Sequence, residues 1–113
     1  MEPRLKAEIW VKAHIRKCAF QNVLVFVTRR GDETAGAVLV KINRLNNQCM
    51  ILTPTTNFED GSRKWLQGTG PDWVEETVAD GYVQKQISFD PDLWVIEIED
   101  AEGRHFLDEK VET

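Results

Sequence analysis

The stretch VLVFVTRRGDETAGAVLVKIN, residues 23–43, decides the fold class of this chain. Residues 23–28 and 37–43 are rich in Val, Leu and Ile, which favour β-strands. Residues 29–36, which lie between them, are polar and contain glycine, as is typical of a turn. The stretch therefore predicts a β-hairpin. Because residues 23–28 are apolar on both faces, they indicate a central strand rather than an edge strand.

Three more strands are predicted toward the C-terminus. Asn46 and Asn47 indicate a tight turn after the hairpin, because Asn tolerates a positive φ angle. Pro54 is expected to end the strand that follows this turn. Strands joined in sequence by short connections form an antiparallel meander. The predicted strands are residues 49–53, 63–68 and 93–98.

Two helices are predicted, one before the hairpin and one before the last strand. The N-terminal segment has both an alternating and a helical apolar pattern. It is interpreted as a short strand over about residues 4–9, followed by a helix to about residue 20. A single helix that begins at Pro3 is the alternative. The second helix is expected to begin at Trp73, after an N-capping Asp72.

These elements predict an α+β fold in the order (β)α-ββββ-α-β. Two helices would cover one face of an antiparallel β-meander sheet. The chain of 113 residues suits one domain spanning residues 1–113, and the charged tail from about residue 108 is expected to be loose. Because several strands are apolar on both sides, the second face of the sheet needs a cover. We therefore expect a homodimer, or contact with another protein, at that face.

The distribution of charge limits the classes of function. The net charge is −5, but residues 1–58 carry nine basic and four acidic groups, whereas residues 59–113 carry five and fifteen. An acidic total disfavours general nucleic-acid binding, which requires a basic surface. No apolar run approaches the ~20 residues needed to cross a bilayer, and the N-terminus has no signal-peptide pattern. A cytoplasmic location without a membrane contact is therefore expected.

The predicted hairpin is the main candidate for a binding surface, because it carries several basic side chains on strands expected to pair. Arginine presents a planar fork of donors that suits carboxylates and phosphates. These side chains are predicted to bind an anionic small molecule or nucleic acid if the chain has a ligand. They are Arg29, Arg30, Lys41 and Arg44.

His14 and Cys18 are the candidates for a metal site. They are four residues apart, so they share one face of a helix, and this spacing can chelate zinc. No CxxC or HxxxH pair accompanies them, and Cys49 and His105 lie on distant segments. We therefore expect no metal, no cofactor and no catalytic residues, and we expect both thiols to be reduced and buried. An enzyme is not predicted.

Three segments carry a resemblance to a known family. They are RLKAEIWVKAHIRKC at 4–18, RRGDETAGAVLVKINR at 29–44 and DPDLWVIEIEDAEGRHFLD at 90–108. Together they resemble the domain-of-unknown-function family numbered 1491, found mainly in alphaproteobacteria. The resemblance implies an α+β fold and a bacterial cytosolic origin, and it implies no activity. The residues themselves favour a non-enzymatic protein-interaction module that self-associates, with an anion-binding domain as the alternative.

Overall fold

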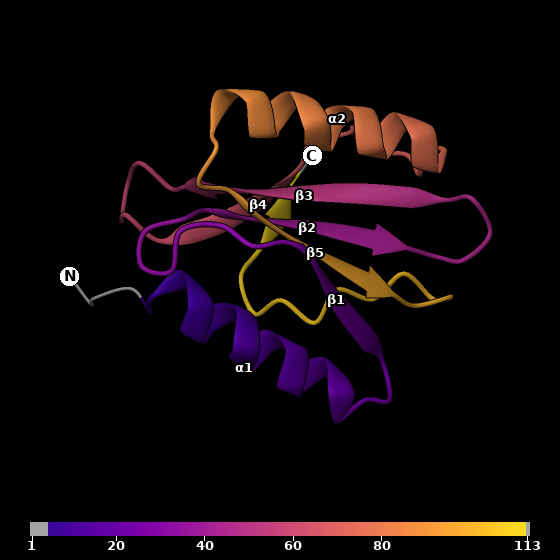
Figure 1. The fold of residues 1–113 in the computed structure, drawn as a ribbon, viewed down its shortest axis with the longest axis horizontal. Coiled ribbons are helices and arrows are strands. Elements are labelled where there is room, and N and C mark those ends of the chain that lie inside the picture. The colour runs from indigo at the N-terminus through magenta and orange to yellow at the C-terminus, as the bar shows by residue number, and fades with distance from the viewer. Residues whose placement is uncertain (1–4, 113) are drawn as a thin grey trace.

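The structure is a computed structural model that describes residues 5–112. Two helices and a mixed six-stranded sheet make up its α+β fold (Figure 1). No helix within these residues is long and apolar enough to span a membrane. The elements in chain order are α1 (Ala7–Ala19), β1 (Leu24–Arg29), β2 (Val38–Asn43), β3 (Cys49–Thr56), β4 (Arg63–Gln67), α2 (Glu76–Phe89), β5 (Trp94–Glu99) and β6 (Val111–Glu112).

The strand order in the sheet is β1-β5-β2-β3-β4-β6. Strands β2, β3 and β4 form the antiparallel meander that the sequence predicts. Asn47 has a φ of 61° in the turn between β2 and β3, as expected for a tight asparagine turn. However, β5 lies between β1 and β2, antiparallel to β1 and parallel to β2. The sheet is therefore mixed, and the prediction of a hairpin over residues 23–43 was wrong.

Burial explains why β5 and not β1 holds the interior position. Three consecutive residues of β5, Trp94–Ile96, are buried, so this strand is covered on both faces. In β1, by contrast, Leu24, Phe26 and Val27 are exposed. A strand covered on both faces suits the interior of a sheet that has helices on both sides. Strand β1 is left at the edge, although its apolar composition indicated a central strand.

The two helices lie on opposite faces of the sheet, not on one face as predicted (Figure 1). Successive side chains of a strand point to opposite faces, so each inner strand contributes to two buried clusters. The second face, which was expected to need a partner, is covered in part by α2. The cluster under α1 includes Ala7, Val11 and Cys18 with Val38, Val40, Ile42, Trp65, Trp94, Ile96 and Ile98. The cluster under α2 includes Ala79 and Val83 with Leu39, Cys49, Ile51, Leu93 and Val95.

Helix α1 begins at Ala7, so the expected strand over residues 4–9 was wrong where the structure describes the chain. Pro3, the start of the alternative helix, and residue 4 lie outside the described residues. No side chain caps this helix. Instead the backbone N–H groups of Ala7 and Glu8 donate to the carbonyl oxygens of Thr34 and Glu33, at 3.2 and 3.0 Å. The loop after β1 therefore satisfies two of the amides that a helix leaves unpaired at its start.

The start of α2 and the end of β3 differ from the predicted positions, because backbone pairing extends further than the local sequence pattern indicates. Val74 and Cys49 exchange two backbone hydrogen bonds, at 2.7 and 2.9 Å. These bonds hold the chain extended up to Glu75, which precedes the first turn of α2 in place of Asp72. In the same way, β3 continues through Pro54 to Thr56, because it pairs with β4 over that length.

The segment after residue 108, predicted to be loose, instead carries β6. This short strand pairs in parallel with β4. The indole Nε1 of Trp65 donates to Glu109 at 3.0 Å, and Lys64 lies 3.1 Å from Glu112. A buried tryptophan needs a partner for its N–H group, so these contacts attach the C-terminal segment to β4.

Candidate functional site

The basic side chains predicted to bind an anion do not gather on one hairpin. Arg29 is at the C-terminal end of β1, where it donates to the carbonyl oxygen of Pro91 at 2.8 Å. Arg30 lies 3.3 Å from the carboxylate of Glu8 on α1. Arg44 follows the far end of β2, where its guanidinium lies 4.9 Å from the ring centre of Trp73. Anion binding through these residues stays a prediction.

Lys41, the fourth of these residues, lies among three carboxylates on the α2 face of the sheet. Its Nζ atom is 2.8 Å from Glu76, 2.7 Å from Asp80 and 3.3 Å from Glu97. Burial by itself lowers the pKa of Lys41, but hydrogen bonds to Asp80 and Glu76 and the charge of Glu97 outweigh it and raise the pKa. The positive charge of Lys41 is therefore compensated within the chain.

The sequence contained a signal for this ion cluster, which we define as Lys41, Glu76, Asp80 and Glu97. Glu76 and Asp80 are four residues apart, so they project from one face of α2. Lys41 and Glu97 are directly paired in the parallel ladder of β2 and β5. That pairing could not be read from the sequence, because β5 was expected elsewhere in the sheet. A cleft of about 420 Å³ beside the cluster is lined by Thr28, Arg29, Lys41, Glu76, Asp80, Val83, Gln84, Ile87, Val95 and Glu97.

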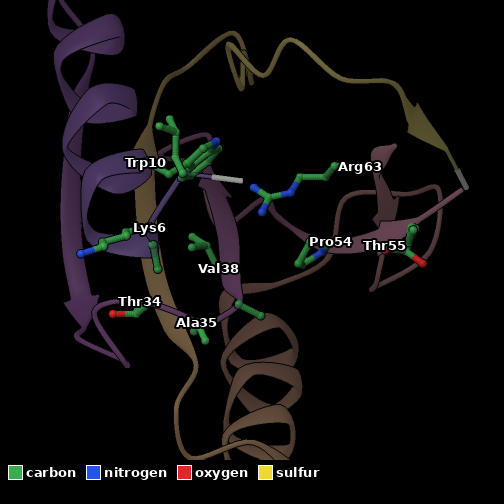
Figure 2. A pocket seen from close by; sticks show the side chains of 13 residues that line it. Lys6, Trp10, Thr34, Ala35, Val38, Pro54, Thr55 and Arg63 are labelled. Atoms are coloured by element: carbon green, nitrogen blue, oxygen red, sulfur yellow. The ribbon is translucent and has the colours of Figure 1, made fainter. Parts of the chain in front are cut away.

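A second cavity, of about 430 Å³, lies on the α1 face at the N-terminal end of α1 (Figure 2). Figure 2 shows Arg63 reaching across it toward Trp10, while the ammonium group of Lys6 points away. The guanidinium of Arg63 is 5.8 Å from the ring centre of Trp10 and 5.9 Å from that of Trp65. The cavity is lined by Leu5, Lys6, Ala7, Trp10, Thr34, Ala35, Gly36, Ala37, Val38, Pro54, Thr55, Thr56 and Arg63.

Strand β1 presents apolar side chains at an edge of the sheet. Leu24, Phe26 and Val27 are between 42% and 63% exposed. Among the described residues, no strand pairs with β1 on the side away from β5. Natural edge strands are usually protected by charges, proline or bulges. In β1, the register of pairing with β5 shifts only after Val27, and the first charged residue of the strand is Arg29. The part of the edge that carries Leu24, Phe26 and Val27 therefore has neither a bulge nor a charge.

His14 and Cys18 have structural surroundings. His14 Nε2 lies 2.9 Å from the carbonyl oxygen of His105, and its ring stacks on Trp10. Burial lowers the pKa of His14 and raises that of the Cys18 thiol, so both groups are held neutral. Over residues 5–112, no three or more His, Cys, Asp or Glu side chains are placed to hold a metal ion.

Comparison with known proteins gives a family and no activity. The family model described as protein of unknown function (DUF1491) matches residues 5–108. A crystal structure of a DUF1491 family protein from Caulobacter crescentus is 40% identical, with a TM-score of 0.85 over 96% of this chain and 99% of that chain. An NMR structure of a DUF1491 family protein from Caulobacter crescentus is also 40% identical, with a TM-score of 0.84 over 99% and 100% of the two chains.

A more distant structure has a similar fold. The solution structure of protein Atu0922 from A. tumefaciens is 28% identical, with a TM-score of 0.72 over 86% of each chain. No curated protein matches the chain. The resemblance inferred from residues 4–18, 29–44 and 90–108 is thus confirmed. On the match over residues 5–108, the chain belongs to the DUF1491 family of proteins of unknown function.

Proposed function

We propose that this protein is a small non-enzymatic interaction module that self-associates through the outer edge of β1. One observation carries the proposal. Leu24, Phe26 and Val27 are exposed on an edge strand with no charged residue before Arg29. An unprotected apolar edge is a template for pairing with another strand, because its outer backbone groups can extend the sheet.

A second copy of the same strand fits this edge. Antiparallel pairing about Phe26 sets Leu24 of one copy opposite Thr28 of the other, and Val25 opposite Val27. Such a contact is isologous, so it closes as a two-fold dimer rather than growing into a fibre. It would join two six-stranded sheets and cover the apolar side chains on both copies.

The charges of the chain support this register. The shift in register after Val27 turns Arg29 to the α2 face, where it lines the cleft beside the ion cluster. Glu99 pairs with Leu24 at the opposite end of β1. In an antiparallel dimer, Arg29 of the second copy would therefore approach the end of the sheet that carries Glu99. The Arg29 side chains of the two copies would lie at opposite ends of the dimer interface, so they would not repel each other.

The test is the oligomeric state of a Phe26→Lys variant, measured by sedimentation equilibrium and light scattering. We expect the unmodified chain to form a dimer and the Phe26→Lys variant to be monomeric at the same concentration. The reason is that the new charge would be buried in the dimer interface. Phe58→Lys is the matched control, since Phe58 is fully exposed in the connection between β3 and β4, which β5 and β2 separate from β1. Circular dichroism checks that each variant is folded.

Two results contradict the proposal. The first is an unmodified chain that remains a monomer up to about 1 mM, a concentration at which even weak specific contacts are populated. The second is a dimer that Phe26→Lys leaves intact, or that Phe58→Lys disrupts equally.

A further inference from the structure

We propose that the cleft between α2 and the strands β1 and β5 binds a small zwitterion whose ammonium and carboxylate groups are separated by an apolar chain. The ammonium would lie at Glu76 and Asp80, and the carboxylate at Arg29. The proposal goes beyond self-association, because the cleft lies on the α2 face of the sheet and the proposed dimer uses the outer edge of β1. Of the four residues predicted to bind an anion, it gives that role to Arg29 alone.

The cleft has the size and the apolar surface that a small ligand needs. Helix α2 packs on β3 and β2, and β5 and β1 lie further along the sheet (Figure 1). Val83 and Ile87 of α2 and Val95 of β5 contribute apolar surface to the cleft. Its volume of about 420 Å³ is within the range of roughly 300–1,000 Å³ found for ligand sites. A chain of several carbon atoms can therefore be covered there.

Arg29 supplies a positive charge to the cleft that the chain does not compensate. Its guanidinium donates to the carbonyl oxygen of Pro91 at 2.8 Å, but none of the ion pairs between described residues involves it. Its Nε–H group is buried and has no hydrogen-bond partner within residues 5–112. Such a group is rare in native proteins. A carboxylate that reaches the guanidinium would neutralise its charge and accept hydrogen bonds from its fork of donors.

Glu76 and Asp80 supply an excess of negative charge on the α2 side of the cleft. Together with Glu97 they place three carboxylates around the single ammonium group of Lys41. Lys41 donates to Oε2 of Glu76 and Oδ1 of Asp80, whereas Oε1 and Oδ2 accept no hydrogen bond from the described residues. Both side chains are about half exposed, so a ligand can reach these oxygens. A second ammonium group would meet two free acceptors and a net negative charge.

The pairing of the strands sets the spacing of the two charges. Arg29 is paired with Val95, and Lys41 with Glu97, which lies two residues further along β5. A rise of about 3.3 Å per residue and a strand spacing of about 4.8 Å put the Cα atoms of Arg29 and Lys41 about 12 Å apart. An α-amino acid carries both charges on one carbon and is too short to span this distance. A simple anion would meet three carboxylates, and a simple cation would leave Arg29 uncompensated.

The probe is 6-aminohexanoate, followed by ¹H–¹⁵N NMR on the full chain. We expect saturable shifts at the amides of residues 28–30, 80–87 and 95–97. Three compounds are compared with it: hexylamine lacks the carboxylate, hexanoate lacks the ammonium, and glycine lacks the spacer. Each should bind at least about tenfold more weakly, because it loses one set of charge-assisted hydrogen bonds or cannot reach both ends.

Variants assign the two ends of the probe. Arg29→Gln should weaken binding of 6-aminohexanoate by about tenfold and leave hexylamine unchanged, because hexylamine has no group for Arg29. Asp80→Asn should weaken both amines by about threefold or more, because Asp80 is partly exposed and its loss is screened by water. Arg16→Gln on α1 and Glu59→Gln between β3 and β4 are the matched controls. Both residues are exposed outside the cleft, so the affinity should not change.

No saturable shift at about 10 mM 6-aminohexanoate would overturn the proposal. Equal affinity for 6-aminohexanoate and either hexylamine or hexanoate would overturn it too, as would equal affinity of Arg29→Gln and the unmodified chain. The comparison of compounds uses the unmodified chain, so it decides the matter even where a variant fails to fold. The proposed dimer is tested separately through Phe26→Lys, so a negative result here leaves it standing.

Discussion

Replacing Lys41 by methionine tests the ion cluster directly. Methionine has nearly the same length and shape as the lysine stem, so the substitution removes the charge and leaves the packing largely intact. It leaves Glu76, Asp80 and Glu97 beside an uncharged neighbour. The free energy of unfolding should therefore fall, and most of the loss should come from Glu97, the least exposed of the three carboxylates.

The structure sets the size of this loss. Removing one partner of a fully buried ion pair costs about 3–5 kcal/mol. The Lys41 side chain is 6% exposed and Glu97 15%, whereas Glu76 and Asp80 are 45% and 57% exposed. Water can solvate the two exposed carboxylates after the substitution, so their contribution is small. We expect Lys41→Met to cost about 2–3 kcal/mol, at or below the lower end of that range.

The assay is urea unfolding followed by circular dichroism and tryptophan fluorescence, with the slope of the transition checked for two-state behaviour. Combining Lys41→Met with Glu97→Gln should recover part of the loss, because the most buried charge is gone. Lys12→Met is the matched control. Lys12 is exposed in an i,i+4 pair with Glu8, so its replacement should change stability by less than about 0.5 kcal/mol.

Two results would refute the reasoning. One is a loss below about 1 kcal/mol for Lys41→Met, which would place the lysine in the range of exposed ion pairs. The other is a double variant whose loss equals the sum of the two single losses, since residues in one network should not be additive.

Two further predictions concern the packing of the loop after β1 and the two histidines, of which His14 is buried and His105 half-buried. Gly31→Ala should destabilise the fold by about 1–3 kcal/mol in urea unfolding, because the new Cβ would collide with the backbone oxygen of Asp92 and lie 2.7 Å from the carbonyl carbon of Leu93. The Cβ added by Gly81→Ala would have no atom within 4 Å, so this substitution should instead stabilise α2 by about 0.5–1 kcal/mol. Equal changes in stability for the two variants would contradict the close packing at Gly31. Burial lowers the pKa of His14 and His105, so below the ordinary value of 6.5 the unfolded chain binds more protons than the folded one. The free energy of unfolding should fall as the pH drops below 6.5 and level off once the pH passes the lowered values. His105→Gln should make that fall shallower between pH 6.5 and 5, and an unchanged slope would count against the effect.

Local patterns in the sequence were sufficient to find most of the elements. The β-branched runs at residues 37–43 and 49–53 became β2 and β3, and the asparagine turn between them set their antiparallel pairing. Turn chemistry and strand preference depend on a few neighbouring residues, so turns and strands can be recognised without knowledge of the rest of the chain. The two-residue strand β6 was missed, because it is too short to show any period.

The candidate sites were harder to predict, because each joins segments that are distant in sequence. Arg63 precedes Trp65 by two residues in the sequence, but its place over Trp10 depends on α1 crossing the same face of the sheet. Likewise Lys41 was assigned to a basic surface, because nothing local shows that Glu97 pairs beside it. Charge is visible in a sequence, but its compensation is a property of the folded chain.

The sequence alone determined the α+β class, the β2–β3–β4 meander and the family, since these depend on local propensity and on motifs that lie within single segments. Only the tertiary structure decided that β5 separates β1 from β2 and that the helices cover opposite faces. The physical reason is that a strand's apolar composition does not say which neighbour will cover it. Residues 23–28 are as apolar as an interior strand, yet β5 is buried on both faces and β1 is left at the edge.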